Sequence, residues 1–437
     1  MQSLGTDYLS PSRFSGMVYL AAILYMLGGA IPPATFGATT IWTGADDNVW
    51  TNALNWTDGV PDDATQAVFT GSGASNLNIE LPAETTLVGS LLFNDEASDP
   101  IVIQPTGHRN LLMQGGTSTI IEMQAGAPDV SVIMGTGGND GVFSIPSSAL
   151  GTVANWSTST LALHGRWARG TSGSRPSYIY QGSGLIELHS PGSVHGSDTT
   201  STLTFDMEPG GTVLLTGNAS ATLNYWDAIE VTGGTLIADR EIASGRDSNA
   251  SFTVDSATLT GNGRIGVSDN TLTIAMNSGA IVDPGRSGET GTLTFENSDV
   301  SFTEGSLLRL DLLNPTDHDA LAFAQTNAGD DSVVPTLNLA TTGVGVILDL
   351  NLLPGFAAGI DDEFQILSGY QAVNGFFKLS DGTVLEENAE FEEDSTLFRI
   401  NYGGSSTILT VIPEPSSLLL LLVSGLGIFA LRRHAVG

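Results

Sequence analysis

Apolar and polar side chains alternate in short segments through the middle of the chain. Each segment opens with Thr followed by Leu or Val, as in 202–205, 212–215, 235–237, 271–274 and 292–295. Alternation with a period of two predicts strands with one buried face, and the intervening Gly, Asn and Ser favour turns. No amphipathic helical pattern stands out between residues 39 and 412. The pattern therefore predicts an all-β protein.

A repeat connects some of these predicted strands. Thr followed by an aliphatic residue recurs at Thr212, Thr235 and Thr258, in two successive steps of 23 residues. A unit of this length is too short to bury a core alone, and it suits one coil of a β-solenoid, whose apolar face is covered by stacking on its neighbours. The repeat is degenerate, so one or more antiparallel β-sandwiches remain an alternative.

Three segments of the repeat region also resemble a known family. The segments 258–265 (TLTGNGRI), 279–285 (GAIVDPG) and 291–294 (GTLT) resemble autotransporter-associated β-strand repeats, over about residues 200–330. The resemblance implies a right-handed parallel β-helix. Residues 41–44, 49–50 and 55–61 resemble the opening of such extracellular repeat proteins. The membrane barrel of autotransporters would read as a series of ~10-residue alternating segments. Residues 332–411 instead predict a terminal β-module that caps the solenoid.

The end of the sequence carries a sorting motif. Pro413-Glu414-Pro415 precede an apolar run at 418–431, which Arg432-Arg433 follow. The run of 14 residues reaches ~21 Å as a helix, against roughly 30 Å of bilayer hydrocarbon, which suits a transient anchor. The order of these features closely resembles the PEP-CTERM sorting signal. The resemblance implies removal by exosortase at the inner membrane, in a Gram-negative-type bacterium that makes exopolysaccharide. An ordinary tail-anchor helix is the alternative.

The beginning of the sequence predicts export. Arg13 precedes an apolar stretch at 14–31, and small residues follow up to Ala38, which is typical of a secretory signal peptide that enters the translocon. A retained membrane helix is the alternative. The predicted organisation is a signal peptide at 1–38, a solenoid body at 39–331, the terminal module at 332–411 and the sorting signal at 412–437.

Composition and charge narrow the function classes. The chain has no Cys, so disulfides, thiolate metal sites and Cys nucleophiles are excluded. Lys and Arg number 14 against 47 for Asp and Glu, and the formal net charge of −33 excludes nucleic-acid binding. Acidic clusters at 361–363 and 386–394 lack the spacing of a Ca²⁺ loop. We expect no cofactor, and at most weak Ca²⁺ binding at the acidic surface.

Candidate sites are few, and no catalytic residue can be nominated. His189 and His195 form the densest histidine group, interpreted either as an exposed loop or as a metal or general-base site. The tripeptide 317–319 (DHD) is either a solvated turn or a cation site. Three tryptophans are candidate carbohydrate contacts, and buried aromatic side chains of a cap are the alternative; they are Trp42, Trp50 and Trp56.

These observations predict an exported structural or adhesive protein of the cell surface or extracellular matrix. The expected partners are exosortase, the translocon, the inner membrane transiently, and acidic exopolysaccharide. The alternative is a secreted polysaccharide lyase or glycoside hydrolase on a β-helix scaffold, because such scaffolds can carry carboxylates and Arg on one face. The fold alone does not decide between these functions.

Overall fold

The computed structural model describes most of the chain between residues 38 and 413. The described ranges are 38–70, 73–94, 99–105, 110–114, 119–134, 141–145, 150–169, 177–189, 202–216, 223–244, 250–266, 271–325 and 335–413. All of them lie within one compact unit, Phe36–Gly437. The predicted signal peptide, apart from Ala38, and the sorting signal beyond Pro413 lie outside the described residues.

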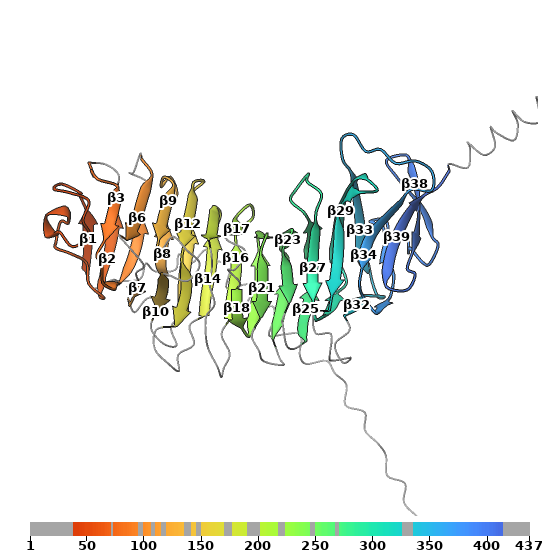
Figure 1. Cartoon of the computed structure of the whole chain (residues 1–437), viewed down its shortest axis with the longest axis horizontal. Helices are drawn as coiled ribbons and strands as arrows, with labels where there is room; N and C mark the ends of the chain where they lie inside the picture. Colours follow the sequence, from red (N-terminus) through yellow and green to blue (C-terminus); the bar gives the residue numbers. More distant parts are fainter. Residues whose placement is uncertain are drawn as a thin grey trace, which may run out of the picture. The chain divides into compact units, whose positions relative to one another are not determined.

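Two long sheets run through the described part of the chain (Figure 1). Sheet A contains, in order, β1 (Ala38–Trp42), β2 (Thr65–Phe69), β5 (Ser90–Phe93), β8 (Thr119–Met123), β11 (Leu150–Asn155), β14 (Ser177–Gly182), β16 (Thr202–Met207), β19 (Ala228–Gly233), β22 (Ser251–Val254), β25 (Leu272–Met276), β28 (Ser298–Phe302), β32 (Thr336–Leu339) and β35 (Ala372–Asn374). Sheet B contains β3 (Asn78–Leu81), β6 (Ile101–Pro105), β9 (Val130–Ile133), β12 (Thr160–His164), β15 (Leu185–His189), β17 (Thr212–Thr216), β20 (Thr235–Ala238), β23 (Thr258–Gly261), β26 (Ile281–Pro284), β29 (Leu307–Asn314), β33 (Val346–Leu352) and β36 (Phe377–Lys378), with β30 (Asp317–His318) beside β29.

Two further sheets supply a third strand to most of the turns. Sheet C contains β13 (Arg166–Arg169), β10 (Val142–Ile145), β7 (Asn110–Met113) and β4 (Thr86–Val88). Sheet D contains β18 (Leu223–Trp226), β21 (Glu241–Ser244), β24 (Arg264–Gly266), β27 (Thr292–Glu296), β31 (Ala320–Ala324), β34 (Glu363–Ser368), β39 (Ser406–Val411), β38 (Thr396–Asn401) and β37 (Glu390–Glu393). A 3₁₀ helix, η1 (Ala53–Asn55), lies in the first turn.

Strands of successive turns pair in parallel, so the chain is a parallel β-solenoid of about 10 turns. The repeat seen in the sequence is the ladder of sheet B, because Thr212 pairs with Thr235 and Thr235 with Thr258. The predicted solenoid is therefore confirmed, and the antiparallel sandwich is not the fold.

The core follows from this register. Val213, Leu236, Leu259 and Val282 occupy the inward positions of four successive sheet B strands, and all are buried. Burying one such side chain stabilises the fold by about 1.5–3 kcal/mol. Each turn gains this free energy only when its neighbours are folded, which explains why the turns form one continuous core.

The C-terminal end departs from the parallel pattern. β34 still pairs in parallel with β31, but β39 runs antiparallel to β34, and β38 and β37 follow as antiparallel strands. Sheet D is therefore mixed, and these strands form the predicted terminal β-module. The parallel strands β32, β33, β35 and β36 lie beyond residue 331, where the sequence placed the boundary of the solenoid. Among the described residues, no helix has the length and apolar character needed to cross a membrane.

Candidate functional site

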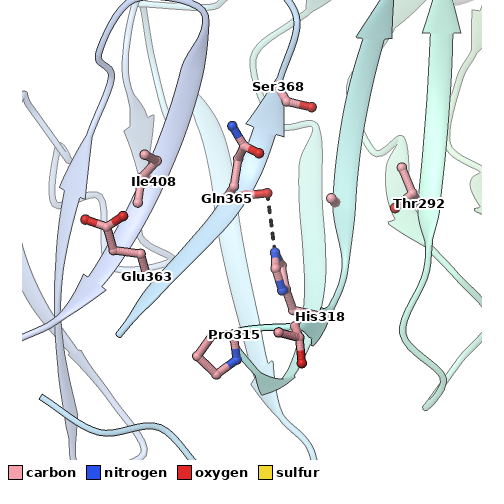
Figure 2. A pocket seen from close by; sticks show the side chains of 9 residues that line it. Thr292, Pro315, His318, Glu363, Gln365, Ser368 and Ile408 are labelled. Carbon is pink, nitrogen blue, oxygen red and sulfur yellow. Dashed lines mark hydrogen bonds between the residues drawn. The ribbon is translucent and has the colours of Figure 1, made fainter. Parts of the chain in front are cut away.

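A pocket lies on sheet D where the parallel turns meet the terminal module (Figure 2). Its volume is about 560 Å³, which falls within the usual range of ligand sites. Its lining combines hydroxyl, amide, imidazole and carboxylate groups with a few apolar ones; the residues are Thr292, Pro315, Thr316, His318, Ala320, Glu363, Gln365, Ser368 and Ile408.

Strand register places these side chains together. Thr292 of β27 pairs with Ala320 of β31, and Gln365 of β34 pairs with Ile408 of β39. Alternation along β34 buries Phe364 and leaves its neighbours Glu363 and Gln365 exposed. Figure 2 shows Glu363, Gln365 and Ile408 on one side of the pocket and Thr292 on the other. Two stretches of chain that are distant in sequence therefore supply the opposite sides.

A tight turn after β29 closes one side of the pocket. Asn314 Oδ1 accepts hydrogen bonds from Thr316 N at 3.0 Å and from Thr316 Oγ1 at 2.8 Å. The chain then reverses into β30, which runs antiparallel to β29. The turn carries Pro315, Thr316 and His318 to the pocket.

His318 has unused hydrogen-bonding capacity. Its Nε2 lies 3.4 Å from the backbone oxygen of Gln365, the contact drawn in Figure 2. Its ring meets the ring of Phe364 edge-on, with 5.4 Å between centroids. Its Nδ1 is shielded from solvent and has no hydrogen-bond partner among the described residues. A buried polar atom without a partner costs about 1–3 kcal/mol.

Asp319, which follows His318, has a different role. It is 0% exposed, and its carboxylate accepts hydrogen bonds from Gly291 N and Asp311 N, both at 2.7 Å. Burial raises the pKa of Asp319 to about 8. Asp311 is also buried and accepts from Gly288 N at 3.0 Å. The two carboxylates thus hold the 285–291 loop, which leads directly into Thr292 of the pocket.

The repeat motif noted in the sequence forms the other support of this loop. Thr260 Oγ1 donates to Gly285 O at 2.6 Å, and Asn262 Oδ1 accepts from Thr292 N at 3.0 Å. A Cβ on Gly291 would overlap Asn262 Oδ1, so glycine is needed there. The residues that carry the resemblance to autotransporter-associated repeats therefore meet at this corner of the solenoid.

The tripeptide 317–319 fits the solvated-turn interpretation only in part, because Asp317 is exposed whereas Asp319 is buried. Asp317 accepts a hydrogen bond from Thr290, His318 lines the pocket, and Asp319 is buried against backbone N–H groups. Within the ranges that the structure describes, no three His, Asp or Glu side chains are arranged to hold a metal ion.

The three tryptophans lie in the core of the first turn. Trp42, Trp50 and Trp56 are 1%, 1% and 4% exposed, and the ring of Trp56 packs edge-on against the other two at 5.0 and 4.9 Å. Trp56 Nε1 donates to Trp50 O at 2.7 Å. A ring enclosed on both faces offers no platform for a sugar, so the alternative, aromatic packing in a cap, describes their placement.

His189 lies on the outer surface of sheet B rather than in a loop. Its ring stacks on that of His164 with 3.9 Å between centroids, and its Nε2 lies 2.9 Å from Glu187 Oε2. Burial, reinforced by His189, lowers the pKa of His164 to about 4. His195 lies outside the described residues. The stacking of His164 on His189 was not predicted from the sequence, although the two residues are one coil apart and so could have been expected to be neighbours.

The sorting motif is described only at its first residue, Pro413; Glu414, Pro415, Arg432 and Arg433 lie outside the described residues. The chain matches no protein-family model and no curated protein. The pocket brings Thr292 of a repeat segment, His318 of the tripeptide and Glu363 of an acidic cluster together with residues that the sequence did not single out.

Proposed function

We propose that the chain is an exported structural or adhesive protein of the cell surface or extracellular matrix. It would be sorted through its PEP-CTERM-like signal, processed by exosortase and associated with exopolysaccharide. The observation that carries the proposal is the continuous parallel stack, in which every turn shares one apolar core with its neighbours. Such a stack is a rigid scaffold that repeats similar polar surfaces at regular spacing.

The strand edges at both ends of the stack are covered, which supports a scaffold whose copies do not pair with one another through their strands. The backbone of Trp50 donates to Glu80 O at 2.9 Å and that of Thr57 to Ile41 O at 3.0 Å, so the strands that begin sheets A and B have hydrogen-bond partners on their outer side. At the other end, Leu385 N donates to Phe377 O at 2.8 Å and covers the last strand of sheet B. Covered edges oppose the pairing of strands between copies that leads to aggregation.

The acidic surface supports an association with polysaccharide through cations. Acidic side chains such as Glu386, Glu390 and Glu392 are exposed near the C-terminal end. Ca²⁺ binds several oxygen ligands and can bridge carboxylates of two molecules. We therefore propose that divalent cations link this surface to acidic exopolysaccharide.

An enzyme of the glycosidase type is less well supported by the pocket. Such enzymes use two carboxyl groups on opposite sides of the scissile bond. Glu363 is the one carboxylate among the residues that line the pocket. The lining therefore favours binding over hydrolysis.

Three measurements in the native host test the proposal. The intact mass of the purified protein should end near Pro413, and the protein should fractionate with the extracellular matrix. A chelator should release it, whereas NaCl of equal ionic strength should not. A mass that retains residues 418–437, together with a cytoplasmic location, would disprove the proposal; retention in the presence of chelator would disprove the cation bridge alone.

A further inference from the structure

The groups that line the sheet D pocket suit a ligand with many hydroxyl groups. Thr292 and Ser368 carry hydroxyls that donate and accept, and the Gln365 amide offers both functions in one side chain. The hydroxyl of Thr316 donates to Asn314 Oδ1 and can still accept. Each hydroxyl of a sugar can likewise donate and accept. A pocket lined by such groups can therefore form hydrogen bonds with several hydroxyls of a sugar.

The charge of the site selects among sugars. Glu363 is the one acidic residue of the lining, and no Lys or Arg is part of it. The chain as a whole carries a net charge of −33. An anionic ligand would enter a repulsive field without a cationic partner in the pocket, so the site favours a neutral ligand.

The apolar part of the lining suits the C–H faces of a sugar ring. Pro315 and Ile408 contribute apolar surface at the pocket, and Ala320 adds only a methyl group.

We propose that this pocket binds a neutral saccharide. That a surrounding matrix polysaccharide supplies this saccharide rests on the proposed function. The binding itself is a property of the folded chain. The pocket would give the scaffold a contact with neutral sugar units in addition to the cation bridge at its acidic surface.

Binding is tested by isothermal titration on the folded protein as purified from the native host. The probes are cellotetraose, maltotetraose and mannotetraose, with oligogalacturonate as the anionic comparison. We expect saturable binding of at least one neutral probe with a Kd of about 1 mM or tighter, and no binding of the anionic probe. Failure of every neutral probe, or tighter binding of oligogalacturonate, would overturn the proposal.

Three variants locate the binding. Ala320→Trp fills the pocket and should abolish binding, while Gln365→Ala, at an exposed side chain, should weaken it about tenfold by removing a hydrogen-bond partner. The matched control is Thr410→Ala, because Thr410 lies on β39 opposite Glu363 but is not part of the lining. Circular dichroism checks the fold of each variant. Binding that survives Ala320→Trp, or that Thr410→Ala reduces equally, overturns the assignment.

Failure of this site can be told apart from failure of the proposed function. If the chain is exported and retained in the matrix but no neutral probe binds, the pocket proposal falls and the scaffold function stands. If a neutral probe binds at the pocket but the chain is not exported, the scaffold function falls and the pocket proposal stands.

Discussion

The N-terminal and C-terminal ends of the solenoid are closed by different structures. At the first turn, residues 43–57 fold back over β1 and β3, and the backbone of Trp50 and Thr57 bonds to the edges of sheets A and B. At the last turns, the chain adds three antiparallel strands to sheet D. A loop only covers an edge, whereas added strands create new surface. The pocket lies where these strands begin, which explains why it is found at this end.

The two ends also differ in how their polar groups are held. Asn55 is buried at the first turn, where its Oδ1 accepts from the backbone N–H groups of Asp46 and Asp47, and its Nδ2 donates to Val49 O at 3.0 Å. In the terminal module, Arg399 pairs with Glu390 at 2.7 Å, and both side chains are half exposed. The polar contacts around Asn55 in the N-terminal cap are therefore buried, whereas this ion pair of the module is exposed to solvent.

The largest expected effect comes from the aromatic core of the N-terminal cap. Trp56→Ala removes a ring that packs on Trp42, Trp50 and Phe69. We expect a loss of about 3–5 kcal/mol in the free energy of unfolding, because the cavity cannot collapse in a rigid stack. Urea denaturation followed by tryptophan fluorescence measures the loss.

The control for this change is Leu54→Ala, at a side chain that is 70% exposed in the same loop. It should leave the urea midpoint unchanged. Equal effects of the two variants would show that the loop does not act through its aromatic core. Saccharide binding by Trp56→Ala, in conditions where the chain is folded, should remain, because the pocket lies in the last turns.

Phe398→Ala makes the corresponding change in the terminal module. Phe398 packs against Phe356, Phe364 and Phe391, and its removal should cost about 3–4 kcal/mol. Because each turn contacts only the turns beside it, the loss of stability should be concentrated in β34 and β37–β39. Hydrogen exchange should show faster exchange there and little change in β1–β5. Faster exchange throughout the chain would contradict separate stabilisation of the two ends.

The sequence predicts the regular turns better than it predicts the pocket. Thr212, Thr235 and Thr258 become ladder partners because successive coils repeat one pattern, and the period is visible in the chain. Gln365 and Ile408 meet only because β39 reverses beside β34, at a site where the register shifts. No period relates these two residues, so their contact could not be predicted.

Burial was the second property that the sequence left open. Asp319 belongs to an acidic turn that reads as solvated, yet it is buried and accepts hydrogen bonds from Gly291 N, 28 residues upstream, and from Asp311 N on β29. The tryptophans of the first turn were open to two interpretations, because aromatic residues serve both cores and sugar sites. Their burial, together with their packing on one another and on Phe69, decides between the two interpretations.

The buried carboxylate behind the pocket gives a smaller effect that depends on pH. Asp319→Asn leaves one of two backbone N–H groups without an acceptor and should cost about 1–3 kcal/mol. The folded chain retains the Asp319 proton up to a pKa of about 8, whereas the unfolded chain releases it near pH 4. The folded state therefore binds more protons, and stability falls as pH rises through this window.

The free energy of unfolding of the native protein, measured by urea denaturation, should accordingly decrease between about pH 7 and about pH 8, by at most about 1.4 kcal/mol per pH unit. Asp319→Asn should remove this slope. Asp283→Asn is the matched control, because burial raises the pKa of Asp283 only to about 6 and its effect is complete below this window. An unchanged slope in Asp319→Asn would assign the pH dependence to another group.

The smallest effect is expected at the exposed ion pair of the module, and it sharpens the contrast in polar contacts between the two ends. Arg399→Ala removes the pair with Glu390 but leaves both positions in solvent, so the change should be within about 0.5 kcal/mol and should vanish at high salt. Asn55→Ala at the N-terminal cap should instead lower the free energy of unfolding by about 1–3 kcal/mol, independent of salt, because it leaves buried backbone groups without hydrogen-bond partners. Urea denaturation at low and high NaCl compares the two variants. If Arg399→Ala proves as costly as Asn55→Ala, the module is held by its charges as much as by its phenylalanines, and the two ends differ only in topology.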